Sequence, residues 1–250
     1  MCLILFSWDE HPRYRLVVAA NRDELHSRAT LPAHAWDDGS GLIAGRDLQA
    51  GGTWMGVTPD GRFAAVTNYH HSPAPETGSR SRGALVADAL RLGETNAEML
   101  RRLEPEKQDY GGFSLLSFDG ATLAWTSNRV AESRFLDPAV YGLANRNIDD
   151  GEPKVVRGKG ELVRRLEDSG GEETPAPSLL ELLSDSTATI MDPRDERERR
   201  LSSIFINDPV YGTRASTVFL LRRDGRGLYV EQGFDSSGAR LEQRRFEVGS

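Results

Sequence analysis

Short apolar runs separated by turn residues dominate the chain, and this pattern predicts antiparallel strands joined as hairpins. The first two strands are expected at 3–8 and 14–20, around a turn. Three further hairpins are expected to pair 53–58 with 62–68, 113–118 with 121–126, and 215–222 with 227–232. Asp-Gly pairs at 119–120 and 224–225 suit the tight type I′ turn, because glycine tolerates a positive φ. The hairpins therefore indicate antiparallel sheets.

Amphipathic helical patterns lie between the hairpins. They cover 83–92, 95–104, 155–167 and the shorter 178–183. Thr95 is the expected N-cap of the second helix, with Glu98 at the spacing of a capping box. Runs rich in Gly, Pro, Ser or Glu at 71–82 and 169–177 are typical of mobile surface loops. Strands, then helices, then strands indicate an α+β fold in which helices pack on antiparallel sheets.

The composition narrows the class of protein. A chain of 250 residues fits one large domain as easily as two small ones, and we expect a single domain spanning 1–250; an apolar fraction of 38% is enough for a hydrophobic core. A net charge of −7 without a dense Lys/Arg block disfavours nucleic acid and anionic membranes as partners, although local basic clusters could bind a small anion.

No apolar run approaches the roughly 20 residues of a membrane span, and the start of the chain lacks a signal-peptide pattern. A single cysteine excludes an internal disulfide, which agrees with a reducing compartment, and we expect a cytoplasmic location. The oligomeric state stays open.

Cys2 is the first residue with candidate chemistry. Cytosolic removal of Met1, which occurs when the second residue is small, would leave Cys2 with both a thiol and a free α-amine. Their ordinary pKa values are about 8.5 and about 7.7–8.0, so the amine can accept the thiol's proton. One residue would then supply both nucleophile and base. The alternative is that Cys2 is a small apolar residue at the start of a buried strand.

The polar motif Asn21-Arg22-Asp23-Glu24 ends the second expected strand. Alternation along a strand places Asn21 and Asp23 on one face and Arg22 on the other. A hairpin could bring Asp23 beside the chain start, where its carboxylate could hold a protonated α-amine. The alternative is a polar strand end with solvated charges.

Two later polar residues lie at the ends of apolar strands. Asn68, in the run Thr67-Asn68-Tyr69, follows a nearly apolar strand, and its amide could donate to a developing oxyanion. Arg214 precedes the apolar strand at 217–221 and could hold an anionic substrate group or tune the thiol. The alternatives are a turn-forming asparagine and a solvated strand edge.

Together these strings resemble the NRDE family, also called the Transport and Golgi Organization protein 2-like family. The matching strings run in family order: MCLILF, AANRDELHSR, GGTWMGV, TNY, GFSLLSF, YGLANR and YGTRASTVFLL. Each is weak alone, but the ordered set is specific and runs from residue 1 to about 221. The family resembles the N-terminal-nucleophile hydrolases of the choloylglycine hydrolase and penicillin V acylase type. That resemblance implies a four-layer αββα sandwich of two antiparallel sheets with helices outside.

The resemblance also implies roles for individual residues. Cys2 matches the nucleophile, and Asp23 looks like the carboxylate that binds its amine. Asn68 looks like the oxyanion asparagine at the end of a strand, and Asn145, in YGLANR, is similar to a second, substrate-side asparagine. Arg214 looks like the late arginine before a C-terminal strand.

The sequence departs from the acylases at Ala20, because they carry an arginine just before the Asn-x-Asp. Whether Arg22, on the opposite strand face, can replace that arginine is open. Arginine forks suit carboxylates and phosphates, so several residues near the motifs are candidates to bind an anionic substrate. These candidates are Asn21, Arg22, Arg28, Arg46, Trp54, Tyr69 and Arg82, with Arg80 close to them in sequence. The alternative is that most of these arginines lie on the solvated surface.

Two functions are compatible with these residues. The first is an N-terminal-cysteine hydrolase acting on a C–N amide or thioester bond of a small anionic acyl substrate. The second is a non-catalytic carrier that uses the same cleft for heme or acyl-CoA, since the family is associated with heme trafficking and with acyl-CoA and lipid homeostasis. No cofactor is required, and the chain has no zinc pattern. For heme, the candidate ligands are Cys2, His11, His26, His34, His70 and His71, although transient delivery needs no fixed ligand.

Overall fold

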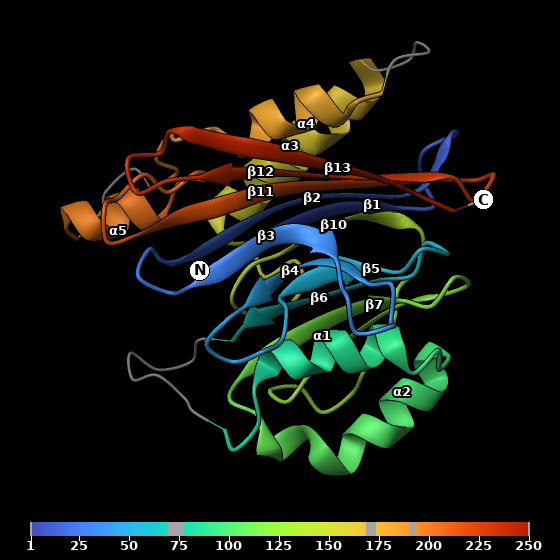
Figure 1. Ribbon diagram of the computed structural model, residues 1–250. Coiled ribbons are helices and arrows are strands. Elements are labelled where there is room, and N and C mark those ends of the chain that lie inside the picture. Colours follow the sequence, from blue (N-terminus) through green and yellow to red (C-terminus); the bar gives the residue numbers. More distant parts are fainter. Residues whose placement is uncertain (1, 70–77, 169–173, 191–193, 250) are drawn as a thin grey trace. The chain divides into compact units, whose positions relative to one another are not determined.

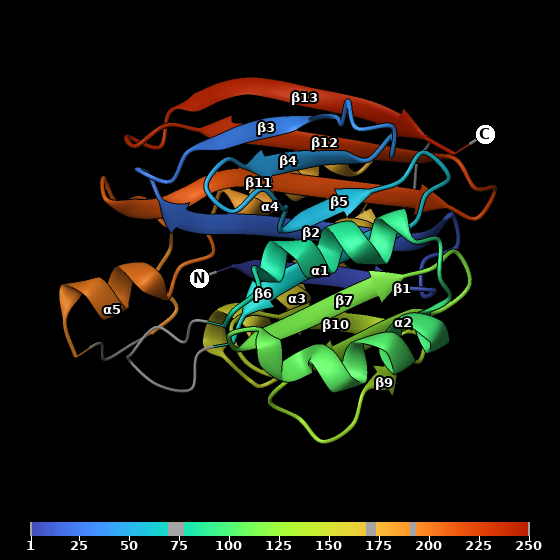
Figure 2. The same ribbon diagram turned by 60° about the horizontal axis from the view of Figure 1, so that its bottom comes forward.

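The structure, a computed structural model, describes residues 2–69, 78–168, 174–190 and 194–249, without the side chain of Arg197. Contacts along the chain divide it into two compact units. Unit 1 comprises Met1–Ser27, Pro138–Ala144 and Ile148–Glu247, and unit 2 comprises Arg28–Asp137, Asn145–Asn147 and Val248–Ser250. Each unit contains one sheet and the helices that pack on it (Figures 1 and 2).

Unit 1 is built on a six-stranded sheet in the order β10-β1-β2-β11-β12-β13. Its strands are β1 (Leu3–Trp8), β2 (Tyr14–Leu25), β10 (Ala139–Leu143), β11 (Tyr211–Arg222), β12 (Gly227–Phe234) and β13 (Arg240–Val248). Its helices are α3 (Pro153–Asp168), α4 (Ala176–Leu183) and α5 (Glu196–Leu201). The central pair, β2 and β11, is antiparallel from Tyr211 opposite Leu25 to Arg222 opposite Tyr14. The beginning of the chain is therefore paired with a strand near its end.

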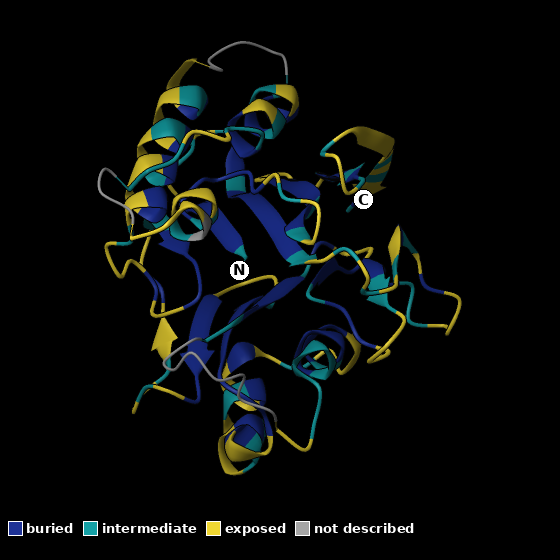
Figure 3. Cartoon of the chain, turned by 90° about the vertical axis from the view of Figure 1, so that its left-hand side faces the viewer, coloured by how far each residue is buried: buried dark blue, intermediate teal, exposed yellow. Residues whose placement is uncertain are grey.

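One face of this sheet forms the core of unit 1 with α3 and α4, which lie along that face in Figure 1. Alternate residues of each strand supply the apolar side chains, as period-2 patterning requires. The strand residues include Leu3, Leu5, Val17, Ala19, Val218 and Leu220, and the helix residues include Val155, Leu162, Leu166, Leu179 and Leu183. Figure 3 shows the buried residues of the helices on the side that meets the sheet.

Helix α3 packs closely on the sheet because two glycines leave room for side chains. A Cβ atom at Gly158 would come within 2.7 Å of Leu5 Cδ1, and one at Gly142 of β10 would come within 2.4 Å of Val155 Cγ1. Both contacts are shorter than real Cβ atoms allow, so these positions fix how near α3 lies to β1 and β10.

Substitution of Gly158 by alanine should lower the free energy of unfolding by about 1–3 kcal/mol, because the overlap with Leu5 strains the core. The gain in helix propensity, about 1 kcal/mol, offsets only part of that cost. Gly160, exposed on the same helix, is the matched control, because a Cβ atom there would meet no other atom within 4 Å. Gly160→Ala should stabilise by about 0.5–1 kcal/mol. Urea denaturation measures both changes, and changes of the same sign would contradict this packing.

Unit 2 is built on a seven-stranded sheet in the order β3-β4-β5-β6-β7-β8-β9 with antiparallel pairing. Its strands are β3 (Thr30–Ala35), β4 (Ile43–Asp47), β5 (Met55–Val57), β6 (Phe63–Asn68), β7 (Phe113–Phe118), β8 (Leu123–Ser127) and β9 (Arg134–Phe135). Its helices are α1 (Arg82–Arg91), α2 (Asn96–Leu103) and the 3₁₀ helix η1 (Glu104–Asp109). The apolar faces of α1 and α2 form a core with strand residues such as Ala64 and Leu115.

The predicted α+β class with antiparallel sheets is confirmed, and so are the four predicted hairpins and four predicted helices within a few residues. The capping box of α2 is present, with the Thr95 side chain accepting from the Glu98 backbone N–H. The predicted loops at 71–82 and 169–177 lie largely outside the described residues, although α1 begins at Arg82 and α4 at Ala176. The single domain stays a prediction. Among the described helices, none combines the length and apolar composition that crossing a membrane requires.

The predicted type I′ turns are wrong. In each Asp-Gly pair only the glycine, Gly120 or Gly225, has a positive φ, whereas type I′ needs one at both residues. Four residues separate the strands in each hairpin, and the aspartate side chain organises the loop instead. Asp119 Oδ1 accepts from the backbone N–H groups of Ala121 and Thr122, which is the Asx-turn chemistry of loop aspartates.

Candidate active site

Cys2 lies at the start of β1, next to the first residue of the ladder with β2. Leu3 is opposite Asn21, so one step along the antiparallel pair brings Cys2 to Arg22. Strand alternation places both residues on the face of the sheet that α3 and α4 do not cover. Burial raises the pKa of the Cys2 thiol, while a hydrogen bond from the backbone N–H of Asp23 and the charge of Arg22 act to lower it.

Asp23 is buried beside Cys2 and held by β11. It is 4% exposed, and Thr213 Oγ1 donates to its Oδ1 at 2.7 Å. Burial raises the pKa of Asp23 from 3.8 to about 6, and the amino-terminal charge, Lys154, Thr213 and Arg22 limit the rise. The folded state therefore holds this proton more tightly than the unfolded chain does, so the group costs stability as the pH rises from about 4 through 6. A carboxyl kept at such a cost is typical of a functional site.

The side chain of Asn21 connects β2 to the end of α4 and to the segment around Ile204. Its Nδ2 donates to the carbonyl oxygens of Leu183 and Ile204, each at 2.8 Å, and Ser216 Oγ donates to its Oδ1 at 2.6 Å. The side chain is fully buried, so these three bonds satisfy its amide inside the core. A contact of Asn21 with substrate stays a prediction.

Arg22 is a buried cation with spare hydrogen-bonding capacity. The residue is 7% exposed, and its Nη2 lies 3.9 Å from Glu24 Oε2. Its Nη1 is buried and has no hydrogen-bond partner among the residues that the structure describes. An unpaired buried guanidinium nitrogen is costly, and an anionic group bound there would satisfy it.

Arg214 lies close to Arg22, at a β-bulge. The register of β11 shifts between Thr213 and Ala215, which leaves Arg214 as the extra residue. Its Nη1 donates to the carbonyl oxygens of Leu25 and His26, at 3.0 and 3.3 Å. Burial and the charge of Arg22 lower the pKa of Arg214, and Glu24 opposes that shift.

Unit 2 brings together the two predicted asparagines. Asn145 Nδ2 donates to the backbone oxygen of Asn68 at 2.8 Å, at the end of β6. The Oδ1 of Asn145 is buried without a hydrogen-bond partner in the described part of the chain. Cys2, Asp23 and Arg214 belong to unit 1, so the predicted convergence of the two groups stays a prediction.

The other predicted substrate residues of unit 2 are occupied by local contacts. Arg28 pairs with Asp47 at 2.7 Å, Arg46 lies over the Trp36 ring at 4.7 Å, and Arg80 pairs with Glu106. Arg82 Nη1 donates to the Gly112 oxygen at 3.2 Å, and the backbone N–H of Tyr69 donates to the same oxygen. Trp54 contributes its backbone oxygen to the sheet, accepting from Val66. These contacts favour a structural role for the arginines.

The described histidines among the candidate heme ligands contact backbone atoms of the protein. His11 Nδ1 accepts from the backbone of Arg13, His26 Nε2 lies 3.1 Å from the Asp208 oxygen, and His34 Nδ1 lies 2.9 Å from the Pro32 oxygen. His70 and His71 lie outside the described residues. Within the described ranges, no three His, Cys, Asp or Glu side chains gather as a metal site would require.

Sequence reasoning missed Thr213, which donates to the Asp23 carboxyl, and Lys154, whose charge lowers the pKa of that carboxyl. Thr213 was hidden because only the pairing of β2 with β11 brings it to Asp23. Lys154 did carry a signal, since it precedes Gly158, Leu162 and Leu166 at four-residue spacing on the apolar face of its helix.

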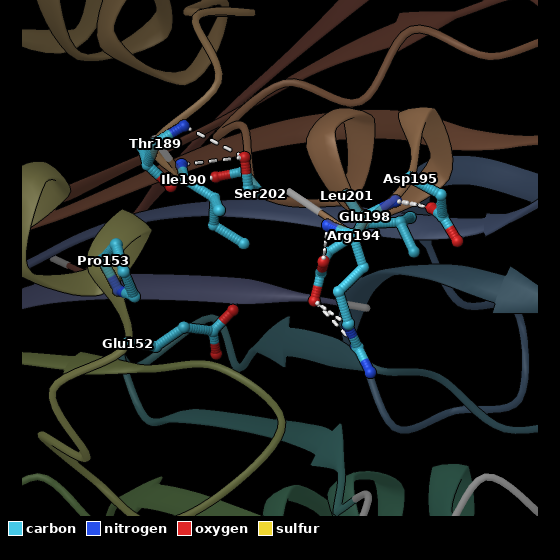
Figure 4. A pocket seen from close by; sticks show the side chains of 9 residues that line it. All are labelled: Glu152, Pro153, Thr189, Ile190, Arg194, Asp195, Glu198, Leu201 and Ser202. Carbon is cyan, nitrogen blue, oxygen red and sulfur yellow. Dashed lines mark hydrogen bonds and ion pairs between the residues drawn. The ribbon is translucent and has the colours of Figure 1, made fainter. Parts of the chain in front are cut away.

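A pocket of about 330 Å³ lies in unit 1, between the start of α3 and the segment that contains α5 (Figure 4). Its lining residues are Glu152, Pro153, Thr189, Ile190, Arg194, Asp195, Glu198, Leu201 and Ser202. None of the predicted site residues is among them. Arg194, just before α5, pairs with Glu198 in its first turn, at 2.7 Å.

Comparisons with known proteins agree with the family that the motifs indicated. Residues 1–236 match the family Transport and Golgi organisation 2. The Transport and Golgi organization protein 2 homolog of Homo sapiens is 30% identical, with 99% of this chain and 98% of that protein covered. The homolog of Bos taurus is 33% identical, over 93% of this chain and 92% of its own length.

Among solved structures, the Caenorhabditis elegans ortholog of N-acylethanolamine-hydrolyzing acid amidase is similar, with a TM-score of 0.53. The match covers 88% of this chain and 92% of that one at 11% identity, so it shows a shared fold. This likeness confirms the predicted N-terminal-nucleophile hydrolase-like fold. The family match spans nearly the whole chain, and the protein therefore belongs to the Transport and Golgi organisation 2 family.

Proposed function

We propose that this protein is an N-terminal-cysteine hydrolase that cleaves a C–N amide or thioester bond of a small anionic acyl compound. The observation that carries the proposal is the juxtaposition of Cys2 with Arg22 on one face of the sheet. Arg22 supplies a buried guanidinium nitrogen with no hydrogen-bond partner among the described residues. An anionic acyl group bound there would bring its carbonyl carbon near the thiol.

The chemistry requires removal of Met1, so that Cys2 carries a free α-amine. The neutral amine takes the proton of the thiol, and the thiolate forms a C–S bond to the carbonyl carbon. Collapse of the tetrahedral adduct breaks the C–N bond, and the ammonium returns the proton to the leaving amine. Water then attacks the thioester, the acid leaves, and the thiol is restored.

Asp23 supports this cycle by holding the ammonium form of the amine. Its carboxyl is buried beside Cys2 and is fixed by Thr213, so it receives the charge without reorganisation. The thiolate itself is favoured by the Asp23 backbone N–H and by Arg22. The oxyanion role that the sequence predicts for Asn68 stays a separate prediction.

The alternative is a carrier of heme or acyl-CoA. Arg22 also favours this function, because a buried guanidinium binds a heme propionate or a CoA phosphate as well as an acyl carboxylate. A carrier would bind such a ligand without consuming it and would not need Cys2.

Two alkylating reagents that differ in charge test the proposal. Iodoacetate and iodoacetamide transfer similar groups to a thiol, but only iodoacetate is an anion. Replacing Arg22 by methionine should lower the rate of Cys2 alkylation by iodoacetate at least about tenfold relative to iodoacetamide, which corresponds to about 1.4 kcal/mol of lost attraction. The ratio of the two rates cancels any change in thiol pKa, and intact mass reports both the label and the state of Met1.

Arg28→Met is the matched control, because Arg28 is already paired with Asp47. It should leave the ratio of the two rates as in the wild type. An unchanged ratio in Arg22→Met would show that Arg22 does not attract anions to Cys2. Retention of Met1 in protein isolated from its own cells would exclude the catalytic cycle, since the amine would be blocked.

A further inference from the structure

Lys154 is a buried cation in an unfavourable place. It is 1% exposed and is the second residue of α3, where the positive end of the helix dipole disfavours a cation. Its Nζ lies 3.5 Å from Glu152 Oε1 and has no hydrogen-bond partner in the described part of the chain. Burying an ammonium is costly unless a compensating charge is near. Neither packing nor helix stability explains a lysine at this position.

The path of α3 shows where this ammonium lies. The backbone of Leu166, near the end of the helix, forms a hydrogen bond with His11 in the turn after β1. Gly158, eight residues earlier, packs over Leu5 in the middle of β1. Lys154 is one turn further on the same helix face, so it lies toward the start of β1, where Cys2 and Asp23 are.

Asp23 is on the side of the sheet that α3 covers. It has the parity of Asn21, whose amide reaches Leu183 at the end of α4, and its carboxyl is buried. The charge of Lys154 acts on this carboxyl and lowers its pKa against the effect of burial. Thr213 donates a hydrogen bond to the same carboxyl, and the charge of Arg22, on the other face of the sheet, also lowers its pKa.

We propose that Lys154 is a positioning residue of the Cys2 centre, whose ammonium keeps the Asp23 carboxyl charged so that it can receive the α-amine of Cys2. The role for the amine rests on the proposed function, whereas the pairing of Lys154 with Asp23 does not. The competing explanation is that Lys154 serves only Glu152, as a local ion pair at the start of α3.

The titration of Asp23 tests the proposal directly. Carbon-13 NMR of labelled aspartate follows the carboxyl signal with pH, and the Asp23→Asn variant identifies it. In the wild type its midpoint is expected at about 6. Lys154→Met, which keeps the length of the side chain and removes its charge, should raise the midpoint by about one pH unit or more. Lys154→Arg keeps the charge and should leave the midpoint near the wild-type value.

Two control variants separate the explanations. Lys159→Met removes the other lysine of α3, which pairs with Asp149 at the surface, and should not move the midpoint. Glu152→Gln removes the local partner of Lys154 and should not raise it either. An unchanged midpoint in Lys154→Met would overturn the proposal. A raised midpoint in a protein that hydrolyses no acyl amide would support the pairing and refute the proposed function alone.

A folding defect in Lys154→Met is also informative, because it leaves Asp23 buried without its counter-charge. The double variant Lys154→Met with Asp23→Asn removes both charges and should recover the fold. Thermal melting measured for the single and double variants gives this comparison. A double variant that melts no higher than Lys154→Met would overturn the pairing.

Discussion

Replacing Cys2 by alanine should reduce hydrolysis of an anionic acyl amide at least about 10³-fold in kcat/KM, since no second group replaces a lost nucleophile. The thiol is the only one in the chain, so no other cysteine can substitute. The measurement is product formation from a panel of acyl amides and acyl thioesters that differ only in whether the acyl group carries a carboxylate. Anionic members should be preferred, because Arg22 has no other hydrogen-bond partner for its buried Nη1 among the described residues.

Binding separates the enzyme from the carrier. Cys2→Ala keeps Arg22 and Arg214, so it should bind the same anionic ligand with an affinity close to that of the wild type, and it should keep that ligand intact. Equal consumption of the ligand by both proteins would show that Cys2 is not the nucleophile. Stoichiometric binding of heme or acyl-CoA by both proteins, without turnover, would instead support the carrier.

Asn21→Leu should lower the free energy of unfolding by about 3–5 kcal/mol. The substitution leaves the carbonyl oxygens of Leu183 and Ile204 and the hydroxyl of Ser216 without their partner inside the core, and each lost partner costs about 1–3 kcal/mol. The shapes of leucine and asparagine are similar, so the change tests the hydrogen bonds more than the packing. Urea denaturation followed by circular dichroism measures the effect.

Ser216→Ala is the graded control for this prediction. It removes only the bond to Asn21 Oδ1, which the structure gives at 2.6 Å, and should cost about 1–2 kcal/mol. If Asn21→Leu lowers the free energy of unfolding no more than Ser216→Ala does, the hydrogen bonds from Asn21 to Leu183 and Ile204 do not stabilise the fold.

Much of unit 1 could be predicted because its central strands carry regular patterns. The runs at β1, β2 and β11 are apolar and bounded by turn residues, and a hairpin from Cys2 necessarily returns near Asp23. The sequence-based prediction ended β2 at residue 20, because the polar motif that follows reads as solvated. In the structure β2 continues to Leu25, since β11 pairs with the whole motif and buries Asn21 and Asp23.

The strands that escaped prediction lack an apolar period of two. β13 carries RLEQRRFEV, and its side chains are mostly exposed at a sheet edge, so charged residues occupy it without cost. β3 contains Pro32 and a register shift, and β10 is short and partly exposed. β10 pairs with β1, which is distant in sequence, and the pairing of β3 with β4 is irregular in register, so local patterns do not report these strands.

The pairing of β2 with β11 has a consequence for the order of events during synthesis. Asp23 and Thr213 are 190 residues apart, and a ribosome needs about 10–40 s to make that length at roughly 5–20 residues per second. For most of this interval the beginning of the chain lies outside the ribosome, while the strand that completes the sheet beside it has not yet been made. A methionine aminopeptidase at the ribosome therefore has a time window in which to free the amine of Cys2. If Met1 is not removed in that window, pairing of β2 with β11 beside the chain start will hinder its later removal.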